Sequence, residues 1–300
     1  MKKSVPMQVD FRPRTLLASL LACLMSGLFS PAVQAVFDPV NDDTDIFLVN
    51  PNIDSQRANI LLYVDNTANW NTAFDNEKSA LVSVVQNLTD QFNLGLMLFP
   101  ETGSPNDSVD GGYVRFGIRQ MTGANKTVLA NDVNGLHKLN DKGNNNTLSE
   151  GMIEVFRYFS GGHSRASHGK IKSDYDGNTV NQAFINALGD YPLPASPTSS
   201  SNYTTPMAHA CQKNFLIYIS NGAANENTSS LTQAENELSS LGYDTNDVIN
   251  LSPDGQEGSW MDEFAKYLAN ADINGADAGE PVVYTYVVEV DPGTTGQGPD

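Results

Sequence analysis

Oxygen-bearing side chains flank three apolar segments of this sequence, at residues 59–65, 147–159 and 214–220. Carboxylate, hydroxyl and amide oxygens are the ligands that Mg²⁺, Mn²⁺ and Ca²⁺ prefer. The ends of parallel strands in an α/β sheet are where such proteins bind ligands. The sequence therefore predicts oxygen donors for a divalent cation in three loops, at residues 65–69, 144–147 and 221–222.

Each of these residues also has a purely structural interpretation. Thr147 and Glu150 have the spacing of a capping box, in which Thr caps a helix and Glu reaches back to it. Asp65 would serve equally well to close a turn, and Asn221-Gly222 is a common turn dipeptide. A capping Thr147 would also be compatible with a ligand role. The three segments are informative only together, in this order on these strand ends.

Two other acidic segments fit calcium loops poorly. Residues 174–178 carry Asp, Asp and Asn at alternating positions, but Thr179 replaces the required Gly and Ile185 the required Glu. Residues 272–277 fail as well, because Ala276 stands at a ligand position. At residues 174–178 we expect an Asx-rich turn instead.

We expect no enzymatic activity. No histidine pair shows zinc-site spacing, and Ser164 lacks the Gly-x-Ser-x-Gly context of a hydrolase nucleophile. No P-loop or Gly-x-Gly-x-x-Gly motif occurs. The histidines are His137, His163, His168 and His209, and the second and third should be solvated.

Strand-like and helical patterns alternate along the chain, which predicts an α/β fold with a doubly wound, mostly parallel sheet flanked by helices. One helical stretch places Leu81, Val84, Val85 and Leu88 on one face. Strands are expected at residues 59–65, 94–99, 113–118, 214–220 and 282–290. Helices are expected at residues 78–88, 147–159, 232–241 and 260–270.

The remaining segments define the organisation of the chain. Residues 1–35 have a basic start, an apolar stretch and small residues at Val33 and Ala35, which is typical of a signal peptide cleaved after Ala35. Residues 36–58 form an irregular lead-in, and residues 59–300 the main domain. Residues 160–210 are a polar insertion, too long for an ordinary connection. No later segment is long and apolar enough to span a membrane.

Charge excludes some partners. The chain has 17 Lys and Arg against 35 Asp and Glu, for a net charge of −18. Such an acidic chain does not suit nucleic-acid phosphates or an anionic membrane surface. Cys23 leaves with the signal peptide, so Cys211 would be a buried thiol or pair with a partner outside these residues.

The motifs together resemble a von Willebrand factor A domain, whose metal-ion-dependent adhesion site uses Asp-x-Ser-x-Ser, a distant Thr and a later Asp. Asp65, Thr67 and Asn69 stand in the register of the first motif, Thr147 at the Thr, and Asn221 at the final Asp. The resemblance covers about residues 58–290 and implies a Rossmann-type fold and a vacant metal position that captures a partner's carboxylate. Because Asn221 is neutral, one of two carboxylates is lost and cation affinity should be weaker.

The signal peptide and residues 147–162 and 211–222 resemble the N-terminal part of PilY/PilC proteins, tip-associated adhesins of bacterial type IV pili. That resemblance implies export to the periplasm, outer-membrane surface, pilus tip or medium. It also implies pilus biogenesis and attachment, with pilus subunits and a surface receptor as partners. The alternative is a metal-independent assembly subunit that contacts pilins. A secreted hydrolase would need a nucleophile–base arrangement that is not visible.

The C-terminus lacks the helix that should cover the last strand of a doubly wound sheet. We therefore expect these 300 residues to be the front part of a longer protein or a truncated product of one. The β-propeller found later in PilY/PilC proteins has no counterpart here.

Overall fold

A computed structural model describes most of the main domain. The described residues are 57–67, 72–100, 111–136, 141, 143, 147–165, 201–209, 212–220, 224–251, 255–256, 258–273 and 281–290. The chain divides into two compact units, Met1–Leu48 and Val49–Asp300, and every described residue belongs to the second. The predicted signal peptide and much of the predicted lead-in and insertion therefore lie outside the described residues.

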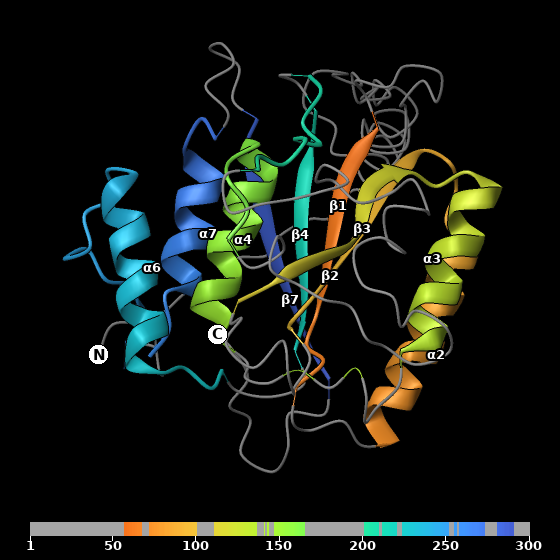
Figure 1. Ribbon diagram of the computed structural model, residues 1–300, viewed down its shortest axis with the longest axis horizontal. Coiled ribbons are helices and arrows are strands. Elements are labelled where there is room, and N and C mark those ends of the chain that lie inside the picture. The colour runs from red at the N-terminus through yellow and green to blue at the C-terminus, as the bar shows by residue number, and fades with distance from the viewer. Residues whose placement is uncertain are drawn as a thin grey trace, which may run out of the picture. The chain divides into compact units, whose positions relative to one another are not determined.

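A five-stranded mixed sheet forms the centre of this unit, in the order β3-β2-β1-β4-β7 (Figure 1). Strand β1 pairs in parallel with β2 and β4, β4 pairs in parallel with β7, and β3 runs antiparallel to β2. The strands are β1 Ala58–Val64, β2 Phe92–Leu98, β3 Tyr113–Gln120, β4 Asn214–Ser220 and β7 Val283–Glu289. A short hairpin pairs β5 Asn250–Leu251 with β6 Gly255–Gln256.

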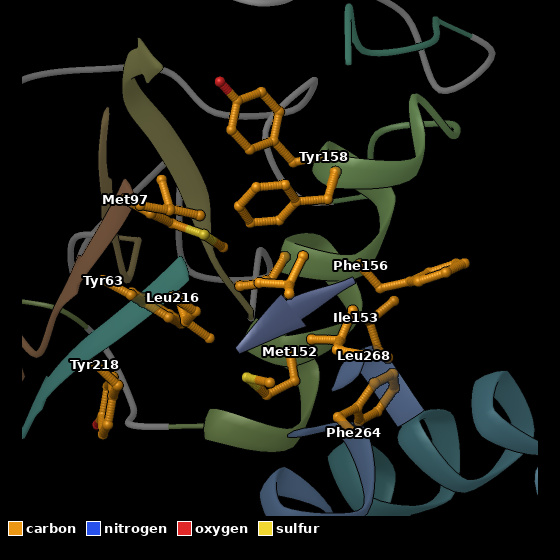
Figure 2. Packing of buried hydrophobic residues seen from close by; sticks show 14 of the residues in the cluster. Tyr63, Met97, Met152, Ile153, Phe156, Tyr158, Leu216, Tyr218, Phe264 and Leu268 are labelled. Atoms are coloured by element: carbon orange, nitrogen blue, oxygen red, sulfur yellow. The ribbon is translucent and has the colours of Figure 1, made fainter. Parts of the chain in front are cut away.

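Helices cover both faces of the sheet, with α2 and α3 on one side and α4, α6 and α7 on the other (Figure 1). Each side has its own buried apolar cluster, so the sheet separates two cores. Figure 2 shows the larger core, where Tyr63 and Tyr218 from the strands lie near Met152 and Ile153 of α4. The helices are α2 Thr72–Asn87, α3 Gly123–Gly135, α4 Leu148–Ser160, α6 Thr228–Ser240 and α7 Met261–Asn270.

The fold is thus α/β with a mostly parallel sheet, as the alternating pattern predicted. All five expected strands are present, and the four expected helices are present with shifted ends. The prediction for α2 was wrong in part, because the helix begins at Thr72 and its inner stripe runs through Phe74, Glu77 and Val85. Val84 consequently points outward and is 55% exposed.

Helix α3 was not predicted. Its buried residues are only Leu129, Ala130 and Val133, with Asn and Gly on either side, so the apolar periodicity is weak. A nearly buried ion pair of 2.9 Å between Arg115 of β3 and Asp132 of α3 adds a long-range contact that a local pattern cannot reveal.

The two ends of the predicted insertion lie next to each other and are joined by backbone hydrogen bonds. The amide of Ser164 donates to the carbonyl of Ser201, and the amide of Tyr203 donates to the carbonyl of Gly162, at 3.0 and 2.9 Å. Glu154 of α4 accepts hydrogen bonds from the Arg165 amide and the Tyr203 hydroxyl. These bonds fix both ends of the insertion on α4.

Candidate functional site

Strand β1 ends in a buried polar turn. Asp65 is 1% exposed, and its Oδ1 accepts hydrogen bonds from the Thr67 amide at 2.9 Å and the Thr67 hydroxyl at 2.6 Å. The Asp65 amide donates to the carbonyl of Ile219 in β4, which continues the parallel ladder to the carboxyl end of the sheet. The structure therefore brings these two predicted site residues together at the expected edge.

Asn66, between them, joins three segments. Its amide group donates to the carbonyls of Phe99 and Asp141 at 2.9 and 2.8 Å, and its side-chain oxygen accepts from the Phe99 amide at 2.7 Å. Its own carbonyl accepts a hydrogen bond from the amide of Gly143. Asn66 is fully buried, and its hydrogen bonds hold the ends of β1 and β2 against Asp141 and Gly143. The sequence did not identify Asn66 as a site residue.

Thr147 is the N-cap residue of α4 and is fully buried, but its side chain makes no capping hydrogen bond. Its hydroxyl oxygen instead accepts a hydrogen bond from the Gly111 amide at 3.3 Å. Glu150 pairs with Arg165 at 2.6 Å. The capping-box interpretation of Thr147 and Glu150 was therefore wrong, because each side chain has a long-range partner.

A carboxylate from another segment satisfies the start of α4. Oε1 of Glu226, six residues beyond β4, accepts a hydrogen bond from the Ser149 amide at 2.6 Å. A negative charge at a helix N-terminus interacts favourably with the helix dipole. Burial nevertheless raises the pKa of Glu226. No sequence signal identified this residue, since its partner lies 77 positions away.

Tyr63 connects the turn after β1 to α4. It is fully buried two residues before Asp65, and a Cβ at Gly151 of α4 would lie 2.9 Å from its Cζ atom. The amide of Gly151 donates to the Thr147 carbonyl, so Thr147 begins the same helical turn. Burial, with smaller contributions from nearby acidic groups that include Asp65 and Glu226, raises the Tyr63 pKa well above its ordinary value.

A second buried carboxyl group, Glu77 of α2, lies on the other side of the sheet. It is 6% exposed, and both of its carboxyl oxygens are buried without a hydrogen-bond partner. Burial, and after it the negative charge of Asp65, raise the pKa of Glu77 from its ordinary 4.5 to about 8. The sequence analysis missed Glu77 because it expected the helix to begin at residue 78, one position after Glu77.

Several expectations lie outside the described residues. They include the predicted ligands Asn69 and Asn221, and also Cys211, His137, His168 and residues 174–178. His163 is described and is exposed, as expected. In the ranges that the structure covers, no group of three or more His, Cys, Asp or Glu side chains is arranged to hold a metal ion.

The described donors still suit a hard cation in kind. Asp65 offers a carboxylate, and a hydroxyl that donates its proton keeps lone pairs for a cation, so Thr67 can do both. The Thr147 hydroxyl and the unsatisfied Glu77 carboxyl group are further buried oxygen donors. Mg²⁺ and Ca²⁺ prefer such oxygen ligands.

No protein-family model matches the chain, and no curated protein matches it. Among solved structures, a crystal form of proximal thread matrix protein 1 from the mussel byssus is similar over 62% of this chain, with 13% identity and a TM-score of 0.34. The match spans 36% of that chain. At this level the likeness identifies neither a fold family nor a function. Among the described helices, none combines the length and apolar character needed to cross a membrane.

Proposed function

We propose that this chain is an exported binding domain of the von Willebrand factor A type, within a PilY/PilC-like protein of the type IV pilus tip. It contributes to pilus biogenesis and to attachment by recognising a partner at the carboxyl end of its sheet. The observation that carries this proposal is the buried Asp65–Thr67 turn at the end of the central strand. Open α/β sheets bind their ligands at this edge.

A divalent cation belongs to this proposal. Asp65, Thr67 and Thr147 would hold it, together with Asn69 and Asn221 from the family resemblance. The bound cation would supply a vacant coordination position that accepts a carboxylate from the partner. Its affinity would lie toward the weak end of the range for oxygen sites, because the final family Asp is Asn221 here.

An assembly role without a metal is the second candidate, and one surface favours it. The edge strand β7 carries four of the large apolar side chains that are well exposed in the described residues: Tyr284, Tyr286, Val287 and Val288. Exposed apolar edge strands are sites of protein contact. In this alternative, Asp65 only closes its turn with Thr67.

The test is made in the bacterium that produces this chain. Surface pili are counted by electron microscopy and attached cells by plating, for wild type, a deletion strain, Asp65→Ala and the control Asp90→Ala. Asp90 is exposed in the turn before β2. Immunoblots of the surface fraction confirm equal export of each variant.

The proposal predicts that Asp65→Ala keeps its pili but attaches poorly, and that EDTA reproduces the defect in wild type. Added Mg²⁺ or Ca²⁺ restores attachment of wild type and not of Asp65→Ala. Normal attachment of Asp65→Ala, with pili lost on deletion, would favour the assembly role. A deletion strain with normal pili and attachment contradicts both.

A further inference from the structure

Glu77 is a carboxyl group buried in an apolar environment. It shares the inner stripe of α2 with Phe74, Leu81 and Val85, since residues three and four apart lie on one helix face. Phe74 and Val85 are fully buried in the core beneath α2, and Leu81 packs against that core. An apolar residue would be the ordinary occupant of this position.

The inner stripe of α2 and the end of β1 contribute to the same buried apolar cluster. Phe74, one helical turn before Glu77, belongs to the same buried cluster as Val64, which directly precedes Asp65. The negative charge of Asp65 repels the ionised form of the Glu77 carboxyl group. Glu77, in the helix that follows β1, thus feels the negative charge of Asp65 at the end of that strand.

Burial of a carboxyl group without a hydrogen bond is costly, and burial of two that repel each other costs more. Two species can relieve this: a proton on Glu77, or a cation between the two groups. A divalent cation offsets both charges at once, while a proton offsets only one. The Thr67 hydroxyl beside Asp65 adds a neutral oxygen donor of the same hard type.

We propose that Glu77 is a ligand of the divalent cation at the end of β1 and replaces the carboxylate that is lost at Asn221. The inference deepens the proposed function and rests on its cation site. With Asp65 and Glu77 the site again has two carboxylates, one from the strand and one from α2. The cation class is Mg²⁺, Mn²⁺ or Ca²⁺, because both charged ligands are oxygen donors.

The test is calorimetric titration of the purified exported chain with MgCl₂, MnCl₂ and CaCl₂, each alone, after treatment with EDTA and dialysis. Glu77→Gln keeps the shape of the side chain and removes its charge. Glu235→Gln is the matched control, the same change on the exposed face of α6. Thermal unfolding by circular dichroism, without metal, checks that each variant folds.

We expect wild type and Glu235→Gln to bind at least one cation with the same Kd, and Glu77→Gln to bind it about ten-fold or more weakly. Without metal, Glu77→Gln should unfold at about the same temperature as wild type, because Gln keeps the shape of the side chain and the Glu77 carboxyl oxygens have no hydrogen bond to lose. This second readout distinguishes a lost ligand from a damaged fold.

Equal Kd values for wild type and Glu77→Gln would overturn the inference and leave the proposed cation site in place. No binding by wild type would overturn the inference as well. The proposed function would then be judged by the attachment of Asp65→Ala, which is measured separately. A Glu77→Gln variant that unfolds at a markedly lower temperature without metal would also contradict it, because Glu77 would then be a structural hydrogen-bonding group.

Discussion

At the scale of single residues, Asn66 holds the candidate site in shape. It is buried and uses both its amide group and its oxygen, so three segments distant in sequence converge on one side chain. Asp65 and Thr67 can form their turn only if the end of β1 keeps this geometry. The conformation of the Asp65–Thr67 turn therefore depends on the hydrogen bonds of Asn66.

Replacement of Asn66 by Ala should lower the free energy of unfolding by about 2–4 kcal/mol, because several buried backbone groups lose their partner. Urea unfolding followed by circular dichroism measures this. Asn87→Ala is the matched control, since Asn87 is exposed and bonds only within α2. Its effect should stay within about 0.5 kcal/mol. Equal effects of the two changes would contradict the role of Asn66.

The sequence predicted the neighbours Asp65 and Thr67, because a turn at a strand end depends on local order. It missed Asn66, Glu77 and Glu226 as site residues, because their roles come from segments far away in the sequence or from burial. A buried acidic residue on an apolar stripe has no signal in composition. Only the packing of α2 on β1 shows that Glu77 is enclosed.

At the scale of elements, α4 lies so close to β1 that one of its residues must be glycine. Gly151 faces the ring of Tyr63, and a Cβ at this position would lie 2.9 Å from the Cζ atom of that ring. Alternating apolar runs were enough to predict the strands and α4. They were not enough for α3, whose buried face carries few apolar residues.

Gly151→Ala should destabilise the domain by about 1–3 kcal/mol, because its Cβ would overlap Tyr63. The same change in an open helix stabilises by up to about 1 kcal/mol. Gly135→Ala at the end of α3 is the control, since a Cβ there meets nothing within 4 Å. Urea titration should show a lower free energy of unfolding for Gly151→Ala, and an unchanged or higher one for Gly135→Ala. A stabilised Gly151→Ala would disprove the close contact.

Helix α7 begins with a buried acid that makes stability depend on pH. Glu263 is 1% exposed and accepts a hydrogen bond from the Ile249 amide at 3.0 Å. Burial, with interactions from Asp262, raises the pKa of Glu263 from 4.5 to about 7. The folded state therefore binds this proton more tightly than the unfolded state.

The contribution of Glu263 is complete below pH 4.5 and is lost as pH rises through about 7. The unfolding free energy of wild type should therefore fall over this window relative to that of Glu263→Gln. Urea unfolding at half-unit pH steps measures the difference, with Glu235→Gln as the control. A difference that grows in the opposite direction, or stays constant, would contradict the burial of this charge.

At the scale of the whole molecule, a polar insertion was predicted between α4 and β4. The insertion begins and ends on α4, where backbone hydrogen bonds join residues 162–164 to residues 201–203. Composition indicated the insertion. That its ends meet could not be predicted, because it depends on long-range hydrogen bonds to Glu154.

Replacement of residues 166–200 by a four-residue Gly-Ser linker should leave the fold intact. Because the ends are already adjacent, a shorter loop costs less closure entropy, and the free energy of unfolding should stay equal or rise by about 1–2 kcal/mol. Urea unfolding and far-ultraviolet circular dichroism measure this. Loss of the cooperative transition would mean that the insertion is part of the core.

Whether a divalent cation binds at Asp65 is tested most directly by thermal unfolding with and without 5 mM Mg²⁺, Mn²⁺ or Ca²⁺. For a Kd of about 10⁻⁴–10⁻³ M, binding adds about 1–2 kcal/mol and a few degrees to Tm. Wild type should show this shift with at least one cation, and Asp65→Ala should show none. No shift in wild type with any of the three would contradict the account.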